Sequence, residues 1–264
     1  MPDRRPVIAL AALIALVPCA PCATATAQDV TLAQATEMLR STSHDEIQTA
    51  IQSLGLLGSP AGVEPLAARI RDGLAPDLLE AAIDTLTVLG RAEAGPVLFE
   101  LSTHRRPEVR LRAVQAIAAC RPRGADRALM TALSDASPDV RGAAARGLGE
   151  IGATAAIDSL FLAFDRGVPE AGPALGRLAR PEHVARVLES LGRVPFDQMR
   201  VVLTELLGRR DVPSRTKLDV IARLAEMATP EIGTFLQEFV EASAAPANDP
   251  VRRAAEDAIT RIAR

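Results

Sequence analysis

The side chains that most often carry enzyme chemistry are few and scattered in this sequence. Its three histidines, His44, His104 and His183, have no second histidine or cysteine at the short spacing of a metal site. The acidic residues are numerous, but most fit helix starts and solvated faces. No catalytic triad can be recognised. The sequence therefore predicts no catalytic, metal-binding or cofactor-binding residue, and the histidines are interpreted as loop or helix-start residues.

Two further patterns could suggest chemistry but lack its context. "GLGEIG" at 147–152 is rich in glycine, yet no strand precedes it and no lysine follows it, so it does not predict a phosphate loop. Cys19 and Cys22 form a CxxC pair, but both lie in an apolar N-terminal segment. The remaining cysteine, Cys120, cannot form an internal disulfide once that segment is removed.

The N-terminal segment has the layout of a secretory signal peptide. Arg4 and Arg5 precede eleven unbroken apolar residues from Val7 to Val17, and small residues follow up to Ala27. This apolar run is shorter than the roughly 20 residues of a membrane-spanning helix. We expect residues 1–27 to be removed and the protein to be exported, periplasmic or secreted, from a bacterium. A retained anchor and a lipidated Cys22 are the alternatives, although the proline before Cys22 departs from the lipobox pattern.

Composition limits the classes of partner. The net charge is −3, aromatic residues make up 2% of the chain, and Trp and Tyr are absent. Binding to nucleic acid would favour clustered positive charge, so no nucleic-acid partner is predicted. No later segment has the length and apolarity of a transmembrane helix, so no membrane insertion is expected after signal removal.

A repeat organises the rest of the sequence. Proline recurs every 31 residues at Pro76, Pro107, Pro138 and Pro169, and an acidic residue follows each one. Proline suits the first turn of a helix and the acid complements the helix dipole, so each pair marks a helix start. Ser137 is the expected N-cap before Pro138. Cys120 aligns with apolar residues of the neighbouring copies and is therefore expected in the core.

Apolar residues spaced by three and four form one stripe on each helix of the repeat. The small residues of "PDVRGAAARGLGEIG", Gly147 among them, are expected to let neighbouring helix axes approach closely. Gly172, Pro173 and Gly176 weaken the helical pattern of the following copy. The expected helices cover 31–41, 45–57, 61–73, 77–89, 94–103, 108–120, 125–135, 139–151, 154–165, 182–192, 196–208, 214–228, 231–242 and 249–264.

The stretch "SDASPDVRGAAARGLGEIGATAAIDSLFLAF" resembles the HEAT repeat, particularly the bacterial type related to the phycobilisome-lyase HEAT-like repeats. The resemblance implies an all-α fold, an α-α superhelix of about six helix pairs with a concave face. Residues 28–264 are expected to form this solenoid, regular over 44–168, degenerate over 169–248, and ending in a terminal repeat helix at 249–264.

The family's structural ladder joins an aspartate before the second helix of a repeat to an arginine in the first turn of a second helix. Asp135 and Arg141 match these positions, and Arg110 and Arg252 match the arginine. Leu79 stands in place of the arginine in the copy that begins at Pro76. The resemblance therefore implies that the ladder is interrupted there.

The favoured function is a non-enzymatic scaffold, a monomer that binds a protein or peptide on its concave face. The fifth, ninth and thirteenth positions of the second helices point away from the apolar stripe, which makes Asp84, Gln115, Arg146 and Glu150 the predicted partner-binding residues. Two alternatives remain open: an envelope-anchored spacer or lipoprotein-like assembly factor, and, more remotely, an enzyme similar to bilin lyases.

Overall fold

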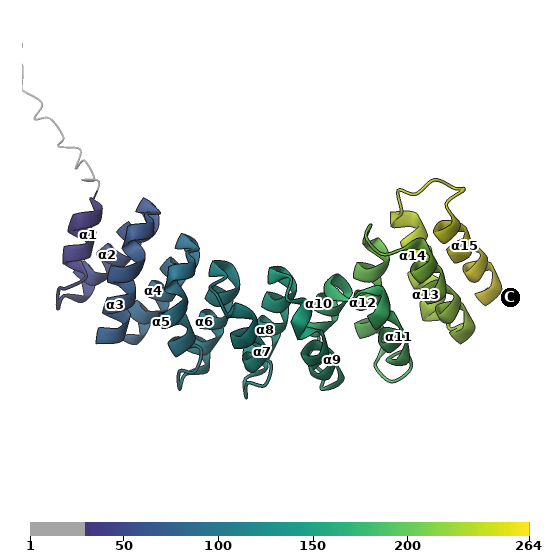
Figure 1. Cartoon of the computed structure of the whole chain (residues 1–264), viewed down its shortest axis with the longest axis horizontal. Coiled ribbons are helices and arrows are strands. Elements are labelled where there is room, and N and C mark those ends of the chain that lie inside the picture. The colour runs from purple at the N-terminus through teal and green to yellow at the C-terminus, as the bar shows by residue number, and fades with distance from the viewer. Residues whose placement is uncertain (1–29, 264) are drawn as a thin grey trace, which may run out of the picture. The chain divides into compact units, whose positions relative to one another are not determined.

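The computed structural model describes residues 30–263, and Thr31–Arg264 fall into one compact unit. The described residues form α-helices and three short 3₁₀ turns, with one isolated β-bridge between Leu191 and Val194. The all-α solenoid is therefore confirmed (Figure 1). The helices are α1 Leu32–Met38, α2 His44–Leu57, α3 Val63–Asp72, α4 Pro76–Leu89, α5 Gly95–Leu101, α6 Pro107–Cys120, α7 Ala125–Ala132, α8 Pro138–Ile151, α9 Ile157–Asp165, α10 Ala171–Leu178, α11 Pro181–Glu189, α12 Phe196–Gly208, α13 Ser214–Met227, α14 Pro230–Ala242 and α15 Pro250–Ile262.

The helix ends follow from the local sequence. Proline occupies the first helical position of α4, α6 and α8, as the repeat predicts. Ser137 stands at the N-cap of α8, but its side chain makes no capping hydrogen bond, which differs from the expectation. Its backbone N–H instead donates to Asp135 Oδ1 at 2.8 Å. The Asp135 side chain thus shapes the turn that leads into α8.

The helices pack in two rows, as expected for a repeat array. The second helices of the repeats, α2, α4, α6, α8, α10 and α12, each pack against the next in the series. The first helices α1, α3, α5, α7 and α9 each pack against the second helix of their own repeat. Figure 1 shows the paired helices following one another in chain order. The second helices therefore build the continuous core of the array.

The packing order changes after α12. Here α13 packs against α11 and α15, while α14 packs mainly against α15 and more lightly against α12. The chain thus departs from the regular alternation from α13 onward, whereas α10 and α12 still follow it. The boundary expected at 169 stays a prediction. The expected signal peptide, residues 1–27, lies outside the described part of the chain.

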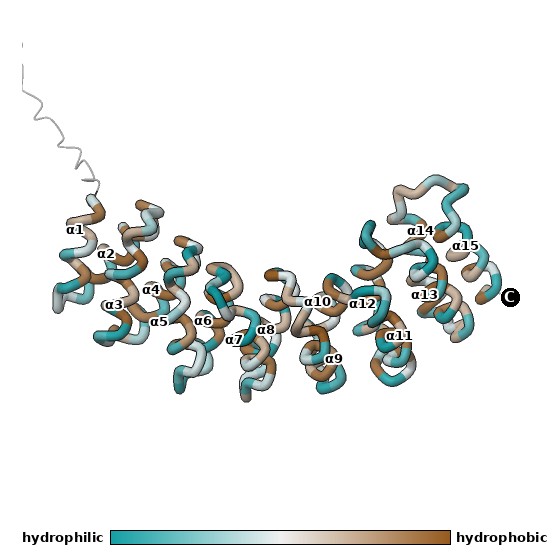
Figure 2. The backbone as a smooth tube through the Cα atoms, in the orientation of Figure 1, coloured by the Kyte–Doolittle hydropathy of each residue, from teal (hydrophilic) through white to brown (hydrophobic). Residues whose placement is uncertain are grey.

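The core consists of aliphatic side chains with many alanines and glycines between them. Leu148 is fully buried, and Cys120 is 4% exposed, as its repeat position predicts. A Cβ atom at Gly147 would lie 2.9 Å from Ala118 Cβ on α6. Figure 2 shows hydrophobic and hydrophilic residues alternating along individual helices. The small residues of α8 therefore allow close helix packing, as predicted.

The short helix α10 shows why glycines occur in a weak helical pattern. A Cβ atom at Gly176 would lie 2.5 Å from Glu205 Cβ and 2.7 Å from the Val202 carbonyl oxygen on α12. The residues that lower the helix propensity of this segment thus permit its contact with the next repeat. Within residues 30–263, no helix combines the length and apolarity needed to cross a membrane.

Candidate functional site

The four predicted partner-binding residues lie on consecutive second helices that pack side by side. Asp84 belongs to α4, Gln115 to α6, and Arg146 and Glu150 to α8. All four are exposed. We call the exposed side of α4, α6 and α8 that carries these residues the second-helix face. The structure brings the four residues onto one row of helices, and their role in binding stays a prediction.

Ion pairs between repeats already engage two of these residues. Asp84 accepts two hydrogen bonds from Arg112 Nη1 on α6, at 2.7 and 2.9 Å. Arg112 also pairs with Glu80 at 3.3 Å, and Glu80 pairs with Arg106 at 3.0 Å. The charges of the face therefore bridge neighbouring repeats, and a partner must compete with these pairs or bind beside them.

Arg146 is paired in a similar way with the following repeat. Its guanidinium lies 3.2 Å from a carboxylate oxygen of Glu170, the residue just before α10. The same carboxylate covers Gly142, where a Cβ atom would lie 2.6 Å from Glu170 Oε1. Glycine at 142 therefore makes room for the Glu170 side chain that holds Arg146.

Two exposed apolar residues extend the second-helix face, and sequence reasoning missed them. Leu56 on α2 is 90% exposed and Val88 on α4 is 74% exposed. They stand at the thirteenth position of their helices, as Glu150 does in α8. That position points away from the apolar stripe, so an aliphatic residue there could have been recognised in the sequence as an exposed apolar contact residue. The face thus combines aliphatic side chains with paired charges.

The ladder expected from the family resemblance is formed between α6 and the loop before α8. The Arg110 guanidinium donates two hydrogen bonds of 2.7 Å to the Asp135 carboxylate, and both side chains are largely buried. These hydrogen bonds hold the pKa of Asp135 below its ordinary value, while burial acts in the opposite direction. The pKa of Arg110 is raised by the same contact. This pair therefore joins two repeats.

The other ladder positions behave differently. Arg141 donates to the carbonyl oxygens of Asp135 and Ala136, at 2.9 and 3.0 Å, and Arg252 donates to that of Ala245 at 3.0 Å. Each arginine thus ties its helix to the loop before it. Leu79 has no group that could form such a contact, so the ladder is interrupted there, as the resemblance implies.

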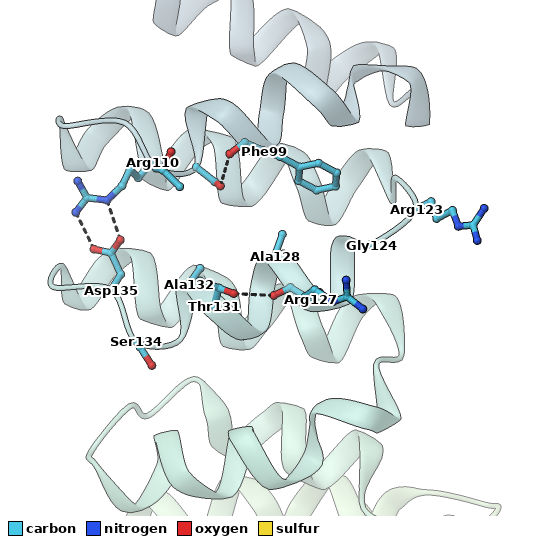
Figure 3. Close-up of a pocket in the computed structure, with 12 residues that line it drawn as sticks. Phe99, Arg110, Arg123, Gly124, Arg127, Ala128, Thr131, Ala132, Ser134 and Asp135 are labelled. Carbon is cyan, nitrogen blue, oxygen red and sulfur yellow. Dashed lines mark hydrogen bonds and ion pairs between the residues drawn. The ribbon is translucent and has the colours of Figure 1, made fainter.

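A groove of about 730 Å³ lies between α5 and α7, on the row of first helices (Figure 3). The Phe99 ring projects toward Ala128, the Arg110–Asp135 pair closes one end, and Arg123 and Arg127 extend from the other. The sequence predicts no site at this groove. Arg127 on α7 is exposed, as Arg146 is, but it lies on the row of first helices. It can therefore serve as the matched control for a charge reversal at Arg146.

The histidines and the buried cysteine have structural surroundings. His104 Nδ1 accepts the backbone N–H of Arg106, and His183 Nδ1 accepts that of Arg180. His44 Nε2 lies 2.9 Å from an Asp77 carboxylate oxygen. Burial raises the pKa of the Cys120 thiol, which lies 3.4 Å from the Leu86 carbonyl oxygen. Among residues 30–263, no cluster of three or more histidine, cysteine or acidic side chains has the arrangement of a metal site.

The paired helices and their stacked rows define the protein as an α-solenoid. Residues 95–171 match the family of HEAT repeats. This stretch of the chain therefore contains HEAT repeats, in agreement with the sequence resemblance. No curated protein matches it.

Several solved structures are similar to this chain. The complex of CpcE and CpcF of phycocyanin lyase from Nostoc sp. shares 21% identity, with 88% of this chain and 94% of that chain covered and a TM-score of 0.48. A designed armadillo repeat protein in complex with the peptide (KR)4 shares 19% identity over 88% and 99% of the two chains, with a TM-score of 0.42. Human deoxyhypusine hydroxylase shares 16% identity over 88% and 96%, also with a TM-score of 0.42.

Proposed function

We propose that this protein is a non-catalytic, exported scaffold that binds a protein or peptide on its second-helix face. The observation that carries the proposal is the row of exposed residues at equivalent positions on α4, α6 and α8, next to the exposed side chains of Leu56 and Val88. A repeat array presents such positions at regular intervals, which suits an extended partner. Fold alone would not support a function, so the proposal depends on these side chains.

The chemistry of the face suggests what the partner carries. Leu56 and Val88 would contact apolar side chains, because large exposed aliphatic residues on neighbouring helices favour burial against a partner. The pairs Asp84–Arg112 and Arg146–Glu170 are half-exposed, and each can exchange its present contact for one with a partner group of the opposite charge. The partner is therefore proposed to carry aliphatic residues alternating with charged or polar ones.

Site-directed photo-crosslinking in the producing cells tests the location of the partner. A photoreactive residue at Gln115 on the second-helix face should give a defined adduct, whereas one at Arg127 on the first-helix row should not. Both positions are exposed, so the two probes have comparable access to solvent. An adduct at Arg127 with none at Gln115 would place the partner on the wrong face for this proposal.

A charge reversal then tests the contribution of Arg146. Arg146→Glu should weaken capture of the crosslinked partner, while Arg127→Glu should not. Because Arg146→Glu also places two carboxylates together at Glu170, the double variant Arg146→Glu/Glu170→Arg restores the ion pair and serves as the stability control. If Arg146→Glu binds normally while Arg127→Glu abolishes binding, the assignment of the face is incorrect.

Export and oligomeric state belong to the same proposal and have direct measurements. Mass spectrometry of the mature protein should show an N-terminus at Gln28, from cleavage after Ala27. A diacylglycerol-modified Cys22 would instead support the envelope-anchored alternative, in which the array is a spacer or assembly factor. Light scattering of the purified protein should give the mass of a monomer.

A further inference from the structure

A second hollow opens where α12, α14 and α15 meet, on elements that carry none of the four predicted binding residues. Its volume is about 610 Å³, which lies within the roughly 300–1,000 Å³ of small-molecule sites. Leu207 of α12, Phe235 and Phe239 of α14, and Val251 of α15 provide its apolar wall. Two of the six phenylalanines of the chain thus line one cavity.

The change of packing order after α12 leaves this space open. Here α13 packs against α11 and α15, and α14 lies only lightly against α12. Small residues, Gly208 at the end of α12 and Ala242 at the end of α14, border the gap together with the loop that follows α14. A Cβ atom at Gly208 would meet no atom within 4 Å. Gly208 thus lines the cavity without crowding it.

Most charged side chains at the cavity already have partners. Arg200 of α12 pairs with Glu238 of α14, and Arg252 pairs with Glu256 at 3.0 Å. The Asp249 carboxylate accepts the backbone N–H groups of Val251 and Arg252, at 2.9 and 3.0 Å, as the N-cap of α15. Glu238 thus has a cationic partner, and the Asp249 carboxylate is hydrogen-bonded to the start of α15.

Two cations remain. Within residues 30–263, the side chains of Lys217 and Arg210 line the cavity and form no hydrogen bond or ion pair. Lys217 is the sole lysine of the chain and is half-buried. Burial lowers its pKa, and the nearby carboxylates of Asp249 and Asp211 oppose this effect. A half-buried cation without a contacting anion is an unfavourable arrangement that an anionic ligand would relieve.

We propose that this cavity binds a small carboxylic acid that carries an aliphatic chain or an aromatic ring. The carboxylate would contact Lys217 and Arg210, and the apolar part would lie against Phe235, Phe239 and Leu207. Guanidinium and ammonium groups are the usual protein partners of carboxylates, and an apolar wall with few polar groups is typical of ligand sites. This inference does not depend on the second-helix face.

Isothermal titration of the full chain with decanoate tests the proposal, and decanol is the uncharged control. Decanoate should bind saturably, with decanol at least about tenfold weaker, because only the acid can contact the two cations. Gly208→Leu should abolish binding by filling the cavity, whereas Gly208→Ala should retain it. Equal affinity for decanol, no saturable binding of decanoate, or unchanged binding by a folded Gly208→Leu protein would overturn the proposal.

Variants on α13 test the charged end of the cavity without altering its shape. Lys217→Gln should weaken decanoate binding about tenfold and leave decanol binding unchanged. Arg215→Gln, an exposed residue of the same helix outside the cavity, should leave both unchanged. Melting curves check that each variant is folded, and Lys217→Gln remains informative if Gly208→Leu does not fold. Equal losses in Lys217→Gln and Arg215→Gln would mean that no specific carboxylate site exists.

Discussion

Single residues set the distance between neighbouring repeats. Gly176 and Gly208 show this well, because both lie in helices yet have opposite surroundings. A side chain at 176 would collide with the backbone and side chains of α12, whereas one at 208 would point into open space. The same residue type thus serves close packing in one place and borders a cavity in the other.

We expect Gly176→Ala to destabilise the protein by about 1–3 kcal/mol through overpacking, although alanine favours the helix itself. Gly208→Ala, the matched control, should be neutral or stabilising by up to about 1 kcal/mol. Chemical denaturation of both variants measures the difference. Equal stability of the two would mean that α10 and α12 are farther apart than described.

The Arg110–Asp135 pair predicts a dependence of stability on pH. The pKa of Asp135 is lower in the folded protein than in the unfolded chain, so the unfolded chain takes up a proton first as pH falls. The stabilisation is therefore present above the ordinary aspartate pKa of about 3.9 and is lost as pH falls through the lower folded value.

Asp135→Asn should accordingly be less stable than the wild type at neutral pH, and the gap should narrow in acid. Denaturation at a series of pH values measures this convergence. Asp84→Asn is the exposed control and should change stability little, because exposed ion pairs contribute little. A constant gap between Asp135→Asn and the wild type down to strongly acidic pH would contradict the assignment.

At the scale of elements, the second helices hold the array together because each of α4, α6, α8 and α10 packs on two neighbours of the same row. Two residues of this row illustrate its two sides: Leu148 on α8 is fully buried, while Gln115 on α6 is exposed to solvent. The effect of a substitution on stability should therefore depend on whether the residue lies on the buried or the exposed side of the row, more than on its helix propensity.

Leu148→Ala should cost about 2–5 kcal/mol, as large-to-small core substitutions do. Gln115→Ala, on the exposed side of the neighbouring helix, should change stability by less than about 0.5 kcal/mol. Thermal melting of the two variants makes the comparison. A melting temperature of Leu148→Ala close to the wild type would show that the register of α8 is wrong.

At the scale of the whole molecule, each helix of the described array contacts mainly its nearest neighbours, and the contact between α12 and α14 is the lightest in the second row. Contacts across α8, α10 and α12 are extensive, whereas α14 packs only lightly on α12. In such an array, stability is close to a sum of repeat and interface terms. The light junction therefore marks where the array can be shortened with least loss.

A fragment that ends at Gly208 should keep a cooperative unfolding transition, because the interfaces up to α12 stay intact. A fragment that ends at 170 removes α10 and exposes the second-row side of α8, so it should be clearly less stable. Circular dichroism melts of both fragments test this order. The reverse order would show that α13–α15 stabilise the regular repeats.

The sequence by itself determined the repeat period, the helix starts at Pro76, Pro107 and Pro138, the burial of Cys120 and the solvent exposure of Asp84, Gln115, Arg146 and Glu150. These follow from local propensity and apolar periodicity, which act over one or two turns of helix. Only the tertiary structure decided which charged residues pair across repeats. It also showed that Gly176 allows α10 to pack closely on α12, and that a cavity opens beside Lys217. Those features depend on the distance between helices remote in sequence, and no local pattern encodes that distance.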